Sequence, residues 1–339
     1  MEVLHDTPFE QSLDEIIDRD GSFARVAVLK ATFQIDKRGR LEVAEQQEPV
    51  RILDECTGAR GRSSVLHESD GAYFKPGTDV VVIGSAHAPG GRPAKSFMAS
   101  LSVGPVKKSI LVLGDRIWSH SALLGVRKSS PTPTEVVPLC WERAFGGTDA
   151  SQDPAGEPEM EWRNPIGAGF CVRRSADALD GLRLPNFEEP GHRIRSWRSK
   201  PAPAGFGFVG RSGQPRVQYA GTYDDEWTRS RMPLLPLDFD YRFFNGAPED
   251  QIVRPHLNGG ELVWARNLSE RGDEHFELPA IDVCFRGVAR GRRIELPGAL
   301  DTVILMLDRR RVVLTWRAKF AVSMNERSEA IRARVARRS

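Results

Sequence analysis

The stretch from Thr302 to Val322, TVILMLDRRRVVLTWRAKFAV, carries the clearest structural signal in the sequence. Two apolar, β-branched runs flank the charged segment Asp308–Arg311, and this pattern predicts an antiparallel hairpin. Side chains alternate between the two faces of a strand, so the second run places six apolar residues on one face. These residues are Val312, Leu314, Trp316, Ala318, Phe320 and Val322.

Further strands are expected on both sides of this hairpin. Arg25–Ile35 is rich in β-branched residues and is followed by a turn and a return strand at Leu41–Val43. A second hairpin is expected from Phe97–Val103 and Val106–Leu113, which flank Gly104-Pro105. Additional strands are expected at Asp79–Ala86, Glu261–Asn267, Phe276–Phe285 and Arg292–Leu296. Short helices are expected at Ser12–Asp20, Ser175–Leu182 and Asn325–Arg338, the last of them capped by Asn325.

Between Thr148 and Pro255 the sequence is dominated by glycine, proline, asparagine and aromatic residues with little periodicity. A structureless connection of that length is unusual in a compact domain, so ordered irregular structure packed on the sheets is expected. Its densest part is Tyr219–Ala247, YAGTYDDEWTRSRMPLLPLDFDYRFFNGA. The predicted fold is mainly β, with twisted, sandwich-like antiparallel sheets, a long loop-rich central region and few short helices.

The domain organisation follows from the length of 339 residues. Residues 1–325 are expected to form one large mainly β domain, with possible sub-lobes at 1–147 and 148–325. Residues 326–339 are expected to form a basic helix or tail.

Composition excludes several classes of function. The 48 lysines and arginines nearly cancel the 46 acids, which gives no reason to expect nucleic acid or a membrane surface as a partner. The four cysteines and seven histidines lack disulfide or metal-ligand spacing, so reduced thiols, no metal and no cofactor are expected. The acidic N-terminus has no apolar segment, and about 18 consecutive apolar residues occur nowhere. A cytoplasmic protein without a membrane span is therefore predicted.

No catalytic constellation emerges from the residues. His87, in the glycine-rich segment Gly84–Pro93, is interpreted as a hydrogen-bonding turn residue, because the spacing fits no phosphate-binding loop. Cys140 is interpreted as a buried thiol, and Ser212 lacks the spacing of a nucleophile elbow.

Three adjacent acids, Asp224, Asp225 and Glu226, admit two interpretations. They are expected to fix a loop by charge-assisted hydrogen bonds to arginines, as Asp238 and Asp240 would fix neighbouring backbone amides. The alternative is an enzyme, hydrolase-like, in which folding brings these acids to His87.

Charge is unevenly distributed although it cancels in total. The first twenty residues carry seven acids and one arginine, whereas Gly191–Tyr223 contains no acid. The second segment is either a solvated surface or a docking face for an acidic protein. Its candidate partner-binding residues are Arg193, Arg195, Trp197, Arg198, Lys200, Arg211 and Arg216.

Several segments together resemble one bacterial family. The segments are VLKATF (28–33), KPGTDVVVIGSAHAPGGRP (75–93), GDRIW (114–118), PLCWERAFGG (138–147), NPIGAGF (164–170), LPNFE (184–188), PAGFG (203–207) and YAGTYDDEW with PLLPLDFDYRFFNGAPEDQ (219–251). In this order they are similar to a domain-of-unknown-function family found beside spike and toxin genes of type VI secretion systems. Within these motifs, structural roles are expected for His87, Trp118, Tyr219, Tyr223, Asp224, Asp225, Trp227, Asp238 and Asp240.

The resemblance implies a function that the residues alone do not. Members of that family are viewed as adaptors or chaperones that help to load an effector onto the secretion spike. The implied partners are therefore a protein effector and a spike protein, and the family supplies no catalytic residues. A purely structural element of a secreted assembly is a further alternative.

Overall fold

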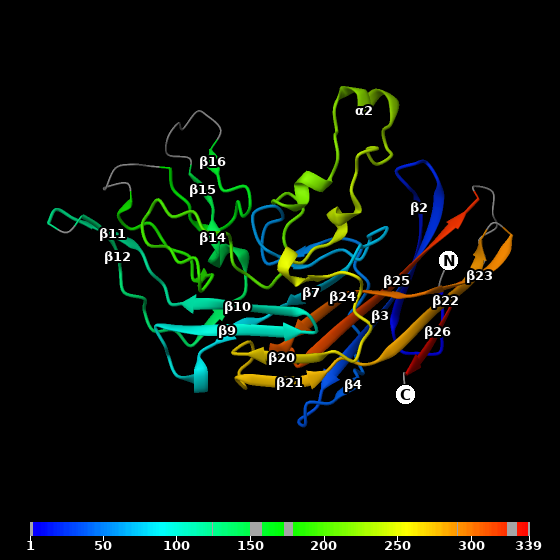
Figure 1. The fold of residues 1–339 in the computed structure, drawn as a ribbon, viewed down its shortest axis with the longest axis horizontal. Helices are drawn as coiled ribbons and strands as arrows, with labels where there is room; N and C mark the ends of the chain where they lie inside the picture. Colours follow the sequence, from blue (N-terminus) through cyan, green and yellow to red (C-terminus); the bar gives the residue numbers. More distant parts are fainter. Residues whose placement is uncertain are drawn as a thin grey trace.

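The fold is organised around β3 (Phe23–Ile35), a 13-residue strand that pairs with three other strands of the largest sheet. The computed structural model describes residues 3–123, 125–149, 158–172, 179–289, 291–323 and 331–337. The described chain is mainly β and is built from mixed sheets in which antiparallel pairing dominates, as Figure 1 shows. The predicted fold class is confirmed.

The hairpin Thr302–Val322 forms as predicted and pairs with β3. It consists of β24 (Ala299–Met306) and β25 (Arg311–Val322), joined by the short 3-10 helix η6 (Leu307–Arg309), with Met306 opposite Arg311. The order of the seven-stranded sheet is β19 (Ile252–Val253), β7 (Thr78–Val82), β24, β25, β3 and β2 (Glu10–Ile17), with β4 (Leu41–Val43) also paired to β3. Only β24 and β7 run parallel in this sheet.

Two further sheets pack on one face of the seven-stranded sheet. The five-stranded sheet has the order β18 (Phe187–Glu188), β10 (Val106–Leu113), β9 (Ser96–Val103), β20 (Leu262–Arg266) and β21 (Asp273–Glu277). The four-stranded sheet has the order β1 (Val3–Leu4), β26 (Ile331–Arg337), β22 (Ile281–Ala289) and β23 (Arg292–Pro297). Each of the three sheets contains strands from both sides of residue 147, so the possible division there does not separate sheets.

One continuous apolar core joins the three sheets. It contains Leu29 and Trp316 of the seven-stranded sheet, Leu101 of the five-stranded sheet and Phe285 of the four-stranded sheet. The six alternate residues predicted on one face of β25 all belong to this core. Burial of this apolar surface from several sheets is the main force that holds the layers together.

The opposite face of the seven-stranded sheet is covered by the irregular central region. Phe208 and Ala247 pack there against Val81 and Val313. Gln251, which is fully buried, donates a hydrogen bond to the carbonyl of Val80 at 2.6 Å. The expectation of ordered irregular structure packed on the sheets is confirmed for the described part of this region.

Buried ion pairs fasten the same face. Lys30 of β3 donates to Asp70 at 2.7 Å, and Arg317 of β25 donates to Asp301 at 2.6 Å. The carbonyls of Asp70 and Ala72 accept further hydrogen bonds from Arg317. Because buried charges are tolerated only when they are paired and hydrogen-bonded, these contacts fix where the segment before β7 crosses the sheet.

Small paired elements complete the fold. They are β5 (Glu55–Cys56) with β6 (Val65–His67), β8 (Ser85–His87) with β13 (Val136–Pro138), β11 (Trp118–Ser121) with β12 (Gly125–Lys128), β14 (Phe145–Gly146) with β17 (Ala168–Gly169), and β15 (Thr148–Asp149) with β16 (Glu159–Met160). The helical elements are η1 (Pro89–Gly91), η2 (Trp141–Arg143), η3 (Arg216–Tyr219), α2 (Asp225–Ser230), η4 (Tyr241–Phe244) and η5 (Glu249–Gln251). No helix of the described chain is both long and apolar enough to cross a membrane.

Two helix predictions are wrong. Ser12–Asp20 forms the edge strand β2, because pairing with β3 places Leu13 opposite Ala27 and buries it. The C-terminal segment predicted as a helix or tail forms β26, in which Ile331, Ala333 and Val335 face the core. Pairing with neighbouring strands outweighs the weak helical preference of such segments. Asn325 and the first half of Ser175–Leu182 lie outside the described residues.

Two predicted strands are interrupted. The expected strand Asp79–Ala86 divides into β7 and β8 at Ile83–Gly84, where Gly84 adopts φ 147°. The expected strand Phe276–Phe285 divides into β21 and β22 around Pro279, which has no amide hydrogen for a strand ladder. The other predicted strands and hairpins are confirmed within a few residues.

The segment Tyr219–Ala247 forms a projection that carries α2 and stands away from the sheets in Figure 1. Its base is an aromatic cluster in which the ring centroid of Phe239 lies 5.3 Å from that of Phe244. The base is also tied to the turn after β2, because Tyr241 donates to Asp18 at 2.5 Å. The aromatic residues therefore fix this segment against the body of the molecule.

Candidate functional site

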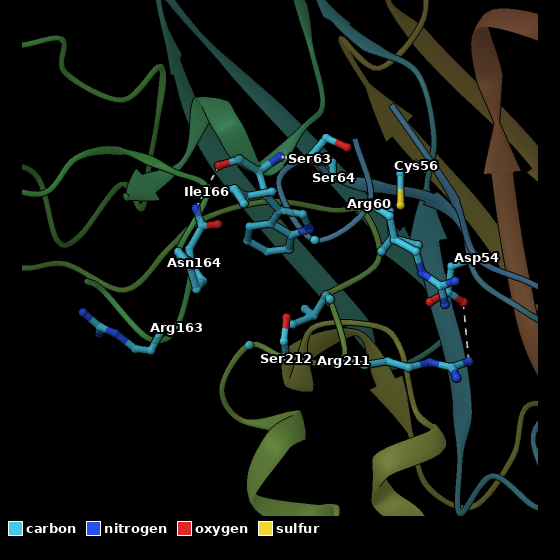
Figure 2. Close-up of a pocket in the computed structure, with 17 residues that line it drawn as sticks. Asp54, Cys56, Arg60, Ser63, Ser64, Arg163, Asn164, Ile166, Arg211 and Ser212 are labelled. Atoms are coloured by element: carbon cyan, nitrogen blue, oxygen red, sulfur yellow. Dashed lines mark hydrogen bonds and ion pairs between the residues drawn. The ribbon is translucent and has the colours of Figure 1, made fainter. Parts of the chain in front are cut away.

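A candidate site is a cavity of about 230 Å³ whose walls come from four separate segments of the chain. It is called the arginine cavity here, because Arg60, Arg163 and Arg211 line it (Figure 2). Residues 54–65, Trp141, residues 163–166 and residues 209–213 supply its walls. These segments are far apart in the sequence, so the cavity exists only after folding.

The first wall is the hairpin of β5 and β6, which carries Arg60 near its tip. The amide of Gly58 donates to the hydroxyl of Ser63, and that hydroxyl donates to the carbonyl of Ala59, both at 2.9 Å. Gly61 follows with φ 76°, a conformation that favours glycine. The loop is thus closed by local hydrogen bonds, and Arg60 extends from it.

Trp141 forms the second wall and joins the hairpin to the rest of the site. Its indole nitrogen donates to the carbonyl of Phe208 at 2.6 Å, and its amide donates to the hydroxyl of Ser64 at 2.7 Å. Glu142 accepts hydrogen bonds from the amide and the hydroxyl of Ser64. Burial raises the pKa of Glu142, but the hydrogen bonds from Ser64 outweigh this effect and hold the pKa below its ordinary value.

The third wall consists of residues 163–166. Asn164 is buried, and its side-chain amide donates to the backbone carbonyls of Trp141 at 2.8 Å and Phe145 at 3.1 Å. Arg163 donates two hydrogen bonds of 2.7 Å to Glu161, which leaves this guanidinium neutralised. In Figure 2 the side chain of Arg163 points away from Arg60 and Arg211.

The fourth wall carries Arg211. Its guanidinium lies 3.5 Å from Asp54 and 3.4 Å from Glu68, both of which are long contacts for a charged hydrogen bond. Glu68 is already bound by Arg216 at 2.5 Å. Figure 2 shows Arg60 and Arg211 pointing toward Asp54 from opposite sides. Apart from the neutralised Arg163, the charged lining residues are Arg60, Arg211 and Asp54, and this excess of positive charge attracts anions.

The structure divides the basic segment into an exposed and a buried part. Arg193, Arg195 and Arg198 are exposed, with Arg198 lying 5.0 Å from the ring of the half-buried Trp197. Lys200 is exposed near the ring of Phe170, and the next carbonyl, that of Pro201, accepts a hydrogen bond from Arg163 at 3.2 Å. The exposed part therefore runs up to the arginine cavity.

Arg216, predicted from the sequence as a candidate partner-binding residue, is buried in the structure. It is 3% exposed, and it donates to the carbonyl of Val209 at 2.8 Å and to that of Phe243 at 2.7 Å in addition to Glu68. A guanidinium held in this way anchors the chain and is closed to a partner. Arg211, in contrast, reaches the cavity.

The three adjacent acids do not act as predicted clamps on arginines. Asp224 caps α2, because its carboxylate accepts the amide of Trp227 at 2.8 Å. Asp225 and Glu226 are exposed in the first turn of this helix. His87 is bonded to Asp308 at 2.8 Å instead of to any of these acids.

The other motif residues have structural contacts. Asp238 accepts the amide of Thr222 at 3.0 Å, and Asp240 accepts that of Arg242 at 2.9 Å, as predicted for backbone amides. Trp118 is buried in a satellite core, and Tyr219 lies under the guanidinium of Arg242 at 4.3 Å. The rings of Tyr223 and Trp227 are 4.7 Å apart.

Cys140, the cysteine singled out from the sequence, carries a protonated thiol. Burial, together with the charge of Glu142, raises the pKa of the Cys140 thiol to about 11, so this thiol is protonated at neutral pH. No group of three or more His, Cys, Asp and Glu side chains within the described ranges is arranged to hold a metal ion.

Sequence reasoning singled out Arg211 and Ser212 but missed their neighbours Arg60, Arg163 and Asp54. These residues belong to no spacing motif, and only the fold brings them together. Trp141 was part of a recognised motif, PLCWERAFGG, but nothing in that motif indicates a cavity wall.

The fold and the cavity define a mainly β chain with an anion-attracting cavity in its irregular central region. A family model described as "Uncharacterized protein conserved in bacteria (DUF2169)" matches residues 20–317. The chain therefore belongs to this bacterial family. No curated protein and no solved structure matches the chain.

Proposed function

We propose that this chain is a non-enzymatic adaptor or chaperone that acts in the cytoplasm, binds a type VI secretion effector and helps to load it onto the secretion spike. The motif order that resembles a family encoded beside spike and toxin genes supports the choice of pathway. The observation that carries the proposal is the arginine cavity, which lies beside exposed apolar and basic residues.

The surroundings of the cavity have the composition of a protein interface. Trp162, which precedes Arg163, is 62% exposed, and Ile52 and Leu53, which precede Asp54, are 86% and 65% exposed. Single exposed apolar residues are common on protein surfaces. Tryptophan and arginine side by side are typical of the residues that contribute most to binding a protein partner.

The charge of the neighbouring surface indicates the kind of partner. Arg193, Arg195 and Arg198 are exposed, and no acid occurs between Gly191 and Tyr223. A surface of one sign speeds up association with a partner of the opposite sign and disfavours partners of the same sign. The proposed effector or spike surface is accordingly acidic.

Affinity purification of the full chain from its native host tests this proposal. Mass spectrometry is expected to identify an effector and a spike protein among the proteins that co-purify. Charge reversal of Arg193, Arg195 and Arg198 to glutamate should weaken this capture. A matched triple reversal of exposed arginines in the four-stranded sheet is the control, at Arg292, Arg293 and Arg332. Recovery of no effector with the wild-type chain would refute the proposal.

A further inference from the structure

The size of the arginine cavity limits what it can receive. Its volume of about 230 Å³ is below the roughly 300–1,000 Å³ that is usual for pockets that bind small molecules and cofactors. A group of the size of one amino-acid residue fits this volume better than a nucleotide or a similar cofactor. One residue of a protein partner therefore has a suitable size for this cavity.

The polar end of the cavity has hydrogen-bond donors to spare. A guanidinium has five N–H donors. Arg60 makes no hydrogen bond or ion pair with any residue that the structure describes. The side chain of Arg211 is 35% exposed, and its ion pairs within the described part of the chain are the two long contacts to Asp54 and Glu68. Arg163 differs from both, because its guanidinium already donates two hydrogen bonds to the carboxylate of Glu161.

The other end of the cavity is apolar. Trp141 and Ile166 line it together with Val65, Pro165 and Val209. Trp141 is held in place by its hydrogen bond to Phe208, so this wall is preformed. The lining of the cavity thus combines guanidinium donors with a group of apolar side chains.

We propose that the arginine cavity binds the C-terminal residue of a partner protein. The terminal carboxylate is received by Arg60 and Arg211, and an apolar terminal side chain packs on Trp141 and Ile166. Capture of a terminal carboxylate is a recurring mode of peptide recognition. The inference rests on the proposed adaptor function and specifies what part of the partner is recognised.

A chain terminus fits this arrangement better than an internal acidic residue. A C-terminal leucine or phenylalanine carries a carboxylate and an apolar side chain on the same Cα atom. An internal glutamate carries a carboxylate but no apolar group for Trp141 and Ile166.

Fluorescence anisotropy with labelled hexapeptides and the full chain tests the proposal. The probes are Gly-Ser-Gly-Ser-Gly-Leu and the same sequence ending in Phe or Lys, each as the free acid and as the C-terminal amide. Peptides that end in Leu or Phe are expected to bind as free acids. Amidation removes the charge that the arginines receive and should weaken binding at least about tenfold. This comparison uses the wild-type protein and does not depend on the folding of a variant.

Variants then locate the site. The double variant Arg60→Gln/Arg211→Gln should bind the free-acid peptides at least about tenfold more weakly. Arg293→Gln is the matched control, because this exposed arginine of β23 does not line the cavity, and the affinity of this variant should stay within about twofold of that of the wild type. Circular dichroism confirms that each variant retains its strands.

Three results would overturn the inference: no free-acid peptide binds, acid and amide bind equally, or the peptide ending in Lys binds as tightly as those ending in Leu or Phe. If an effector still co-purifies in any of these cases, the adaptor function survives without this cavity as its recognition site. If the free acids bind but no effector co-purifies, the cavity assignment survives and the adaptor function fails.

Discussion

Replacement of Arg216 by methionine should destabilise the protein strongly, although the residue belongs to a basic segment that looks like surface in the sequence. Arg216 holds Glu68 at 2.5 Å, and both side chains are 4% exposed. Removal of one partner of a buried ion pair costs about 3–5 kcal/mol, since a buried charge is left uncompensated. Lys75, whose ammonium lies 3.9 Å from Glu68, compensates part of this loss. The expected loss in unfolding free energy is therefore about 3 kcal/mol.

Urea unfolding followed by tryptophan fluorescence measures this loss, with Arg198→Met as the control. Arg198 is exposed and contacts only the ring of Trp197 among the contacts described, so its replacement should cost about 1 kcal/mol or less. The double variant Arg216→Met/Glu68→Gln also removes the uncompensated charge of the Glu68 carboxylate and should recover part of the unfolding free energy. If Arg216→Met and Arg198→Met lose the same amount, the assignment of Arg216 as an anchor is wrong.

Three further predictions concern other parts of the fold. Burial, aided by the charge of Arg51, lowers the pKa of His67 from 6.5 to about 4. As the pH falls from 6.5 to about 4, the unfolded chain therefore binds a proton at His67 that the folded chain does not, and the free energy of unfolding decreases. The variant His67→Gln should show a smaller decrease in unfolding free energy over that pH interval. Gly146 has φ 150°, and an added Cβ would lie 2.1 Å from the carbonyl oxygen of Asn164. The variant G146A should therefore lose at least about 1–3 kcal/mol of unfolding free energy in urea. The control G191A, where the space is open, should not lose this amount. Asp224→Ala removes the cap of α2, worth about 1 kcal/mol, and hydrogen exchange should show faster exchange of the Trp227 amide with an unchanged thermal midpoint of the whole protein.

Strands with strong alternation could be predicted from the sequence, and those that depend on their neighbours could not. The hairpin Thr302–Val322 has two long β-branched runs and a charged turn, so local preference and tertiary pairing agree. In β26 the apolar residues Ile331, Ala333 and Val335 alternate with Arg332 and Arg334. A helix was predicted here because alanine and arginine favour helices more clearly than a short alternation favours a strand. In the structure this segment pairs with β22, which lies more than forty residues earlier in the chain.

The candidate site was much harder to predict from the sequence than the fold. Arg211 was identified because it lies in a segment without acids, but the same criterion also selected Arg216, which is buried. Charge in the sequence does not distinguish an arginine that anchors the chain from one that faces solvent. Glu68 makes that distinction in the structure, and it lies more than 140 residues before both arginines.

The prediction about Asp224, Asp225 and Glu226 failed for a related reason. A run of acids after a chain turn can cap a helix as well as pair with arginines, and Asp224 does the former. The six-residue helix α2 was too short to leave a periodic signal in the sequence.

The most direct test of the account compares which proteins co-purify with the wild-type chain and with Arg60→Gln/Arg211→Gln in the native host. The account predicts that the wild-type chain and the control Arg293→Gln, whose arginine lies outside the cavity, retain the same effector. The double variant should recover at least about tenfold less of it, while its thermal midpoint remains that of the wild type. Equal recovery by a folded double variant would contradict the claim that the arginine cavity is where this protein binds its partner.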